Sequence, residues 1–512
     1  MENRVRVDWL KWSFLPALAM VLGVPFIFRP RAEAVDERAL RLVIITPHNE
    51  QIRTEFSFAF DRWHRARYDG QGVVIDWRTP GGTSEIRRQL FAEYQAAIRR
   101  GPIEPGSMSY DLLFGGGSYE HTQVKRAVSF TAPDGTRHAA TLSIPVDFSP
   151  EQLDEWYGDN TIGRNVLYDP DLHWFGTAVS GFGIVYNTDV LARLGVPQPQ
   201  TWNDMTDPRL VGWVALADPG QSGSIATAVE VILQRLGWQD GWRLLRESSA
   251  NARYFADSSS KIPIDVSLGE AAVGMCIDFY GRTQAQFIRN ADGSERVGYV
   301  DPPRLSDIDP DPVSLLNGGP NQQLAIRFIE FCLTEQGQAL WQFPRATGDD
   351  DMGPHRFELR RLPARRIMYE RYFDRFVDKV NPFDLAEPMD SWNPDIRSFV
   401  APLLGAMAID NLDELRAAWV AINAAPADHP NRSEMRRLFA EMPTVTLLDG
   451  REASLADTTD LAAIKADWRA ARSLEGIAKG YDPLKAEHDR IAWSEFFRTR
   501  YEQIADLNRS SR

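Results

Sequence analysis

The sequence predicts an α/β protein made of two separately folded halves that face each other across a binding cleft. Strand and helix patterns alternate between residues 42 and 114, and a second set of strand candidates begins at Gly181. Three strand-to-helix turns contain glycine followed by serine or threonine. Strands that alternate with helices favour a parallel sheet, and such sheets bind ligands beyond the carboxyl ends of their strands.

The first half contains three short apolar runs, at residues 42–45, 73–77 and 111–114, which are predicted strands. Between them, apolar side chains recur every three or four residues, so each connecting segment is predicted to be a helix with one buried face. In the first helix these residues are Ile52, Phe56, Ala59, Phe60 and Trp63, and in the second they are Ile86, Leu90, Tyr94 and Ile98.

In the second half, strands are predicted at residues 181–186, 214–217 and 272–278, with a helix at residues 225–238. A further helix is predicted at residues 322–341. The two-lobed binding domain is expected to span residues 40–350. From about residue 363 to residue 512 the pattern predicts a helical C-terminal extension. Its tryptophans predict that it packs against other parts of the chain, and they are Trp392, Trp419, Trp468 and Trp493.

The composition limits the class of partner. The net charge is −14, which argues against nucleic acid, because phosphate backbones need a basic surface. The two cysteines, Cys276 and Cys332, are too few for a disulfide framework. Each lies in an apolar segment, so buried free thiols are expected, with one disulfide as the alternative in an oxidising compartment.

The N-terminal residues indicate in which cellular compartment the protein is located. Residues 12–28 are uncharged and largely apolar, and Arg4, Arg6 and Lys11 precede them. This run favours an uncleaved signal anchor within residues 1–31 over a signal peptide cleaved after Ala34. In either case the rest of the chain is expected outside the cytoplasm, most simply in the periplasm and tethered to the cytoplasmic membrane.

The three turns predict the ligand contacts. They are Gly-Gly-Thr-Ser at residues 81–84, Gly-Gly-Gly-Ser at residues 115–118 and Pro-Gly-Gln-Ser-Gly-Ser at residues 219–224. The start of a helix offers free backbone N–H groups and a partial positive charge to an anion. The alternative role for these serines and threonines is that of ordinary helix N-caps, and one residue can fill both roles.

Several motifs resemble the solute-binding components of ABC importers, in particular the iron(III)-type extracellular solute-binding family. The matching stretches are residues 174–188, the Pro-x-Thr-Trp-x-Asp-Met-x-Asp-Pro pattern from Pro199, residues 215–224, 269–274, 278–280, 310–313 and 335–338. The resemblance implies a two-lobed type II periplasmic binding fold that traps a solute and delivers it to a permease in the inner membrane.

The resemblance also implies binding positions at His48, at Thr83 and Ser84, at Ser222 and Ser224, and at Asp278 to Tyr280. Iron-binding members carry two neighbouring tyrosines near the last position, whereas this chain has only Tyr280 there. With the turns included, the predicted ligand-binding set is His48, Thr83, Ser84, Gly117, Ser118, Ser222, Gly223, Ser224, Asp278 and Tyr280. No metal or cofactor is predicted.

The same residues are compatible with other ligands. His48 and Glu50 could join Asp278 and Tyr280 in holding a hard or borderline cation, although no close-spaced ligand motif supports a metal. Candidate solutes are a ferric ion with a synergistic anion, a phosphonate-like or carboxylate anion, and a small sugar-like molecule. Enzyme motifs are incomplete, because the turn at Ser222 lacks the final glycine of a nucleophile elbow. We therefore expect a binding protein that is not an enzyme.

The extension allows a second interpretation, in which the chain is a membrane-anchored sensor or scaffold that uses the same binding fold for signalling. A basic cluster lies at its start, at residues 360–366. This cluster is predicted to be a solvated face that pairs with Glu370 and Asp374 rather than a site for lipid headgroups.

Overall fold

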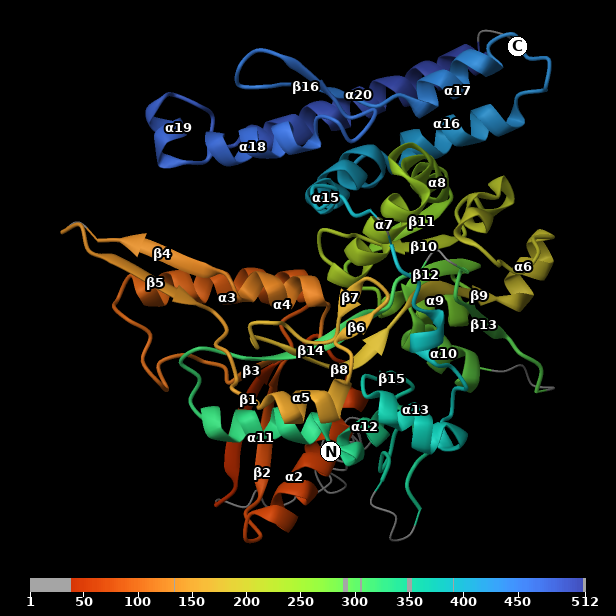
Figure 1. Ribbon diagram of the computed structural model, residues 1–512. Helices are drawn as coiled ribbons and strands as arrows, with labels where there is room; N and C mark the ends of the chain where they lie inside the picture. Colours follow the sequence, from red (N-terminus) through yellow and green to blue (C-terminus); the bar gives the residue numbers. More distant parts are fainter. Residues whose placement is uncertain are drawn as a thin grey trace, which may run out of the picture.

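The computed structural model describes residues 38–509, apart from residues 133, 289–292, 304–305, 348–351 and 390. Two β-sheets form the centres of two lobes, and a mainly helical C-terminal region lies over the second lobe (Figure 1). The first sheet has the strand order β15-β8-β14-β3-β1-β2, and the second has the order β11-β10-β12-β9-β13. The predicted α/β organisation with a helical C-terminal region is confirmed.

The first lobe begins with the predicted β-α-β-α-β series. Its parallel strands β1, β2 and β3 pair with β1 in the centre, and β14 then pairs antiparallel with both β3 and β8. The sheet strands are β1 (Leu40–Ile45), β2 (Val73–Arg78), β3 (Leu112–Phe114), β8 (Phe175–Ser180), β14 (Asp309–Leu315) and β15 (Leu362–Pro363). Its helices are α2 (Glu50–Arg67), α3 (Thr83–Ile98), α4 (Ser118–Val124), α5 (Pro150–Tyr157), α11 (Gln322–Leu333), α12 (Glu335–Gln342), α13 (Arg366–Tyr372) and α14 (Pro382–Leu385).

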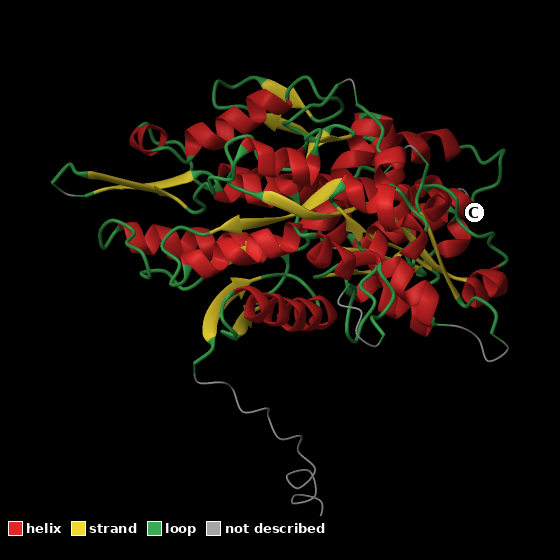
Figure 2. Ribbon diagram, turned by 60° about the horizontal axis from the view of Figure 1, so that its bottom comes forward, coloured by secondary structure: helices red, strands yellow, loops and turns green. Residues whose placement is uncertain are grey.

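Two small hairpins complete this lobe. They are β4 (Ala127–Thr131) with β5 (Arg137–Thr141), and β6 (Thr161–Ile162) with β7 (Asn165–Val166). The β4–β5 hairpin projects from the body of the molecule in both views (Figures 1 and 2).

The second lobe is built around β10, which pairs in parallel with β11 and β12. Its strands are β9 (Phe182–Asn187), β10 (Val214–Ala217), β11 (Ala252–Ala256), β12 (Val273–Ile277) and β13 (Val297–Val300). Its helices are α6 (Thr188–Leu194), α7 (Gly223–Leu236), α8 (Trp238–Ala250), α9 (Lys261–Leu268) and α10 (Asp278–Phe287), with two 3-10 turns at Trp202–Thr206 and Pro208–Leu210.

The chain crosses between the two sheets twice. It leaves the first sheet at the end of β8, passes through Gly181 and enters β9 directly. It returns from β13 to β14 through residues 301–308. Two adjacent crossings of this kind allow two lobes to move about a hinge. The sequence patterns predicted β9 but not β8.

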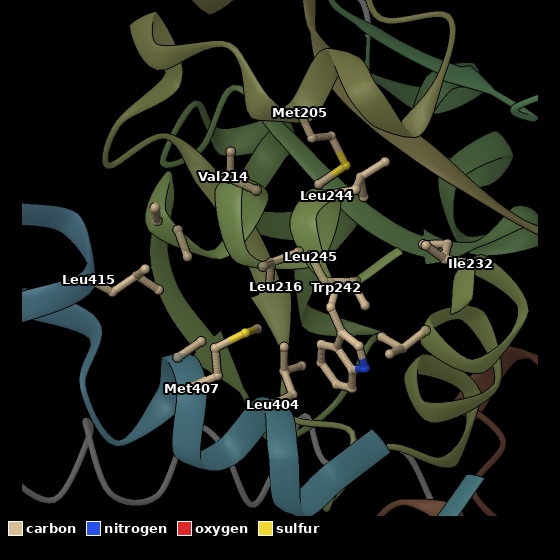
Figure 3. Packing of buried hydrophobic residues seen from close by; sticks show 14 of the residues in the cluster. Met205, Val214, Leu216, Ile232, Trp242, Leu244, Leu245, Leu404, Met407 and Leu415 are labelled. Atoms are coloured by element: carbon tan, nitrogen blue, oxygen red, sulfur yellow. The ribbon is translucent and has the colours of Figure 1, made fainter. Parts of the chain in front are cut away.

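The C-terminal region packs on the second lobe. Its elements are α15 (Arg397–Leu404), a π-helical turn (Gly405–Ile409), α16 (Leu412–Ala424), α17 (Arg432–Ala440), β16 (Thr444–Thr446), β17 (Glu452–Ser454), α18 (Leu461–Ala471), α19 (Leu474–Ala478) and α20 (Lys485–Arg509). Its apolar side chains continue the core of the second lobe, and Figure 3 shows Leu404 and Met407 beside Leu216 and Trp242. As predicted, Trp419, Trp468 and Trp493 are buried.

Residues 363–385, at the start of the predicted extension, lie against the first lobe. Strand β15 pairs with β8 at the edge of the first sheet, and Met368 packs with Phe343 of the first lobe.

The structure also bears on the cysteines and on membrane-spanning helices. Cys276 in β12 and Cys332 in α11 are buried free thiols, as expected from their apolar segments. None of the described helices is long and apolar enough to cross a membrane. The anchor predicted within residues 1–31 lies outside the described residues.

Candidate functional site

A pocket lies between the two lobes, with lining residues from both sheets. It has a volume of about 90 Å³, so the lobes leave room for a small molecule only. The first lobe contributes Pro47, His48, Gly81, Gly82, Thr83, Gly116, Gly117, Ser180, Asp309, Pro310, Asp311 and Arg361. The second lobe contributes Phe182, Ser222, Ser224, Thr227, Ser258, Ser259, Ile277, Phe279 and Tyr280.

The two lobes touch where α3 and α7 begin. Arg88 of α3 donates hydrogen bonds to the carbonyl oxygen of Gly220 and to Oε1 of Gln221, each at 3.2 Å. The backbone at Gly82 approaches the same loop so closely that an added Cβ would lie 2.7 Å from the carbonyl oxygen of Gln221. The N-termini of α3 and α7 therefore meet at the pocket, one from each lobe.

Unsatisfied hydrogen-bond donors concentrate at this junction. The first N–H groups of a helix have no partner within the helix, and no side chain caps α3. Thr83 lines the pocket, and its Oγ1 is buried without a hydrogen-bond partner among the described residues. These groups are arranged to bind a ligand that accepts hydrogen bonds.

The start of α7 adds a chain of hydroxyl groups. Ser222 caps α7 by accepting from the N–H of Ile225 at 3.5 Å, and its Oγ lies 3.1 Å from Oγ of Ser224. Ser224 in turn lies 3.0 Å from Oγ of Ser259. Ser222 is therefore both a helix cap and a pocket residue, so the two roles weighed from the sequence occur together.

A buried cluster of charged and ionisable groups forms the floor of the pocket. Arg361 donates from Nη1 to Oδ2 of Asp311 at 2.7 Å and from Nη2 to Oγ of Ser180 at 2.9 Å. His48 Nε2 lies 2.9 Å from the same carboxylate oxygen, and the N–H of Gly116 donates to Oδ1 at 2.9 Å. Both oxygens of Asp311 thus have partners within the protein.

The cluster sets the charge of its members. Burial lowers the pKa of His48 more than the neighbouring Asp311 raises it, so the imidazole is neutral at neutral pH. Burial acts to raise the pKa of Asp311, but Arg361 and His48 outweigh it and hold the pKa below its usual value. The guanidinium and the carboxylate therefore form a buried ion pair.

A second carboxylate, Asp309, faces the pocket from β14. Ser118 donates to it from Oγ at 2.6 Å and from its N–H at 3.2 Å. Burial raises the pKa of Asp309 to about 6, despite these hydrogen bonds. Like Asp311, this group is satisfied by the protein itself.

The structure brings six of the ten predicted residues together in the pocket lining, and these are His48, Thr83, Gly117, Ser222, Ser224 and Tyr280. Gly223 lies just behind, with its backbone against Thr83. Ser84 donates to Glu120 at 3.4 Å, and Ser118 donates to Asp309. Asp278 accepts from the N–H of Phe279 at 2.7 Å, and burial raises its pKa to about 6. Ser84, Ser118 and Asp278 are not part of the lining.

Sequence reasoning missed several polar lining residues, chiefly Ser180, Asp309, Asp311 and Arg361. Asp309 and Asp311 stand in an Asp-Pro-Asp-Pro run whose alternation, in a strand, directs both carboxylates to one face. The prediction that the basic cluster is solvated was wrong at Arg361 and Arg365, which are each 4% exposed. The reason is that β15 joins the edge of the sheet and carries Arg361 into the cleft.

The cation set considered from the sequence does not assemble. Across the part of the chain that is described, no group of three or more His, Cys, Asp or Glu residues is placed to hold a metal ion. His48 is engaged with Asp311, and Glu50 is exposed at the start of α2.

A family comparison matches the part of the chain in which it crosses between the two lobes. Residues 147–346 match the family model for bacterial extracellular solute-binding protein. The match covers less than half of the chain, and over this stretch the chain is similar to that family. The stretch includes β8, β9 and β14, which carry the chain between the lobes.

Two curated relatives match part of the chain. The phosphoglycerate transport regulatory protein PgtC of Salmonella typhimurium is 27% identical over 270 residues, or 48% of this chain and 65% of that protein. An uncharacterized protein of Haemophilus influenzae is 28% identical over 205 residues, or 38% of this chain and 56% of that protein. The chain thus spans less than two thirds of the length of the curated relatives it matches.

A solved structure shows the same fold. The substrate binding protein of the ABC transporter from Agrobacterium tumefaciens is 15% identical and superposes with a TM-score of 0.52. The match covers 75% of this chain and 96% of that protein. The two sheets and their crossings therefore have the same fold as that protein.

Proposed function

We propose that this chain is the substrate-binding component of an ABC-type importer, which captures a small organic anion between its lobes and delivers it to a permease. Binding requires no bond to be made or broken, so the chain acts without catalysis. A solute that contacts both lobes stabilises the closed form by its greater affinity for that form.

The observation that carries this proposal is the meeting of the N-termini of α3 and α7 at one pocket. Each helix places a partial positive charge and free N–H groups there, and an anion at a helix N-terminus gains about 0.3–1 kcal/mol, or more when the site is buried. The buried, unpartnered hydroxyl of Thr83 supplies a further donor. Only a solute that accepts from both lobes would use all these groups at once.

The acidic residues of the pocket have partners within the protein. Asp311 is neutralised by Arg361, and Asp309 is held by Ser118. The solute we propose bears a carboxylate or a phosphate group, whose oxygens accept several hydrogen bonds. The Salmonella relative is named for phosphoglycerate transport, and phosphoglycerate carries both groups on a three-carbon body. It is therefore the first probe.

The test is isothermal titration calorimetry with phosphoglycerate, and with glycerol as an uncharged control of the same carbon skeleton. We expect saturable binding of phosphoglycerate or a related small anion in the micromolar range, about −8 kcal/mol. The anion assignment would be refuted if glycerol bound with equal affinity. It would also be refuted if none of the small carboxylates or phosphates bound.

The organisation of the whole chain is part of the proposal. Residues 1–31 would anchor the protein to the cytoplasmic membrane, residues 40–350 would form the two-lobed binding domain on the periplasmic side, and residues 363–512 would form the extension. Fractionation of cells that express the full chain tests this. Release of the protein by osmotic shock alone would argue against the anchor.

A second function is favoured by one specific arrangement. Arg397 of the C-terminal region donates to Thr227 at 3.0 Å and to Glu230 at 3.2 Å in the second lobe. It also stacks on Tyr119 of the first lobe at 4.3 Å. The C-terminal region is therefore placed to respond to lobe closure, and the Salmonella relative is named as a regulatory protein. Capture of a signalling partner instead of a permease would favour this sensor role.

A further inference from the structure

A second cavity lies where the C-terminal region packs against the second lobe. It is bounded by α8 from the second lobe and by α16, α17 and the segment after α17 from the C-terminal region. Its volume is about 590 Å³, and it shares no lining residue with the pocket between the lobes. It is large enough for a molecule of two fused aromatic rings.

The walls of this cavity are aromatic. Trp238 and Trp242 line it from α8, and Trp419 and Phe439 line it from α16 and α17. Flat aromatic surfaces favour a flat apolar ligand, which can stack on one ring and meet the edge of another. Trp242 also has a buried indole N–H with no hydrogen-bond partner among the residues described.

Arg246 supplies a buried positive charge in the cavity lining. It is 3% exposed, and it donates from Nε to Sδ of Met407 at 3.2 Å. From Nη2 it donates to Sδ of Met442 at 3.0 Å and to the carbonyl oxygen of Glu441 at 3.1 Å. Thioether sulfur is a weak acceptor.

No carboxylate of the described chain lies within 4.0 Å of this guanidinium, so its charge is not paired. The nearby acidic side chains have other partners, because Glu247 pairs with Arg243 at 3.2 Å and Glu441 pairs with Arg437 and Arg500. Burial lowers the pKa of Arg246, which reflects the cost of holding an unpaired charge out of water.

An unpaired buried charge is unfavourable in the empty protein and becomes favourable when a ligand supplies the opposite charge. At the rim, Arg436 is exposed and forms no ion pair with any residue in the described ranges. Its charge would draw an anion toward the cavity.

We propose that this cavity binds a small aromatic carboxylate, with its ring between Trp242 and Trp419 and its carboxylate on Arg246. The site is separate from the solute pocket. Because it lies between the second lobe and the C-terminal region, an occupant would fix these two parts together.

The test uses the full chain and two probes of the same shape, naphthoate and its uncharged amide, naphthamide, in isothermal titration calorimetry. We expect saturable binding of naphthoate and at least about tenfold weaker binding of naphthamide, because only the carboxylate pairs with Arg246. The variant Arg246→Met keeps an unbranched apolar side chain and removes the charge, and it should lose at least about tenfold in naphthoate affinity. Ser222→Ala with Ser224→Ala, in the other pocket, should leave naphthoate binding unchanged.

The same experiment can overturn the proposal. Absence of saturable naphthoate binding up to about 1 mM, or equal affinity for both probes, would exclude an aromatic carboxylate site. Loss of naphthoate binding in the serine variant would place the ligand in the pocket between the lobes. If Arg246→Met does not fold, the affinities of the unchanged chain for the two probes still test the role of the carboxylate. The variant Arg436→Gln is a second test, because it should weaken naphthoate binding and leave naphthamide binding unaltered.

Discussion

Replacement of Gly82 by alanine should hold the lobes apart. A Cβ at this position would lie 2.7 Å from the carbonyl oxygen of Gln221 in the other lobe, whereas ordinary contacts begin at 3.4 Å. The obstacle is backbone, so it cannot rotate away, and the closed form must open by roughly 0.7 Å at this point or accept the overlap. Overpacking of this kind costs about 1–3 kcal/mol. Because the cost falls on the closed form alone, solute affinity should fall about 5- to 150-fold.

The assay is calorimetry with the bound anion, combined with small-angle X-ray scattering of the free and saturated protein. Gly81→Ala is the matched control, because the three atoms nearest to a Cβ there all belong to the side chain of Glu85 in the same lobe, which can move. We expect Gly82→Ala to weaken binding and to give a larger radius of gyration at the same saturation. Wild-type affinity in Gly82→Ala, or an equal loss in both variants, would refute the role of this contact in closure.

Three further predictions concern the pocket. The double variant Ser222→Ala, Ser224→Ala should weaken binding of the anion by about 1–3 kcal/mol in calorimetry, and unchanged affinity would remove these hydroxyls from the binding set. Arg361→Met should lower the free energy of unfolding by about 3–5 kcal/mol in urea, because it leaves Asp311 buried without its ion pair, and adding Asp311→Asn should recover part of the loss; equal stability of the single and double variants would contradict the pairing. Burial raises the pKa of Asp309 to about 6, so the unfolded chain loses this proton at a lower pH than the folded protein does, and ionisation of Asp309 opposes folding as the pH rises from about 4 to about 6. Asp309→Asn should therefore gain up to about 3 kcal/mol relative to the wild type across that interval, and a constant difference between the two proteins would contradict the raised pKa.

Local patterns predicted much of the architecture. The helices α2, α3 and α7 follow from apolar periodicity, and the strands β1, β2, β3, β10 and β12 follow from short runs of mainly apolar residues. Strand β8, Phe-Gly-Thr-Ala-Val-Ser, was missed because glycine, threonine and serine interrupt its apolar residues, although it is buried along its whole length between β14 and β15.

The turns of the site could be predicted and the charges could not. Gly82, Thr83 and Ser222 stand directly at helix starts, where sequence alone assigns a role. The position of Arg361 depends on the pairing of β15 with β8, two segments that are far apart in the sequence. Its ion pair with Asp311 is likewise a contact between distant segments, so no local pattern could reveal that this arginine is buried.

A crystal structure of the protein with phosphoglycerate, or with the small anion that it binds most tightly, tests the central claim most directly. The account predicts that carboxylate or phosphate oxygens lie about 2.7–3.2 Å from N–H groups at the start of both α3 and α7. An anion that contacts only one lobe, or that binds outside the cleft, would contradict it.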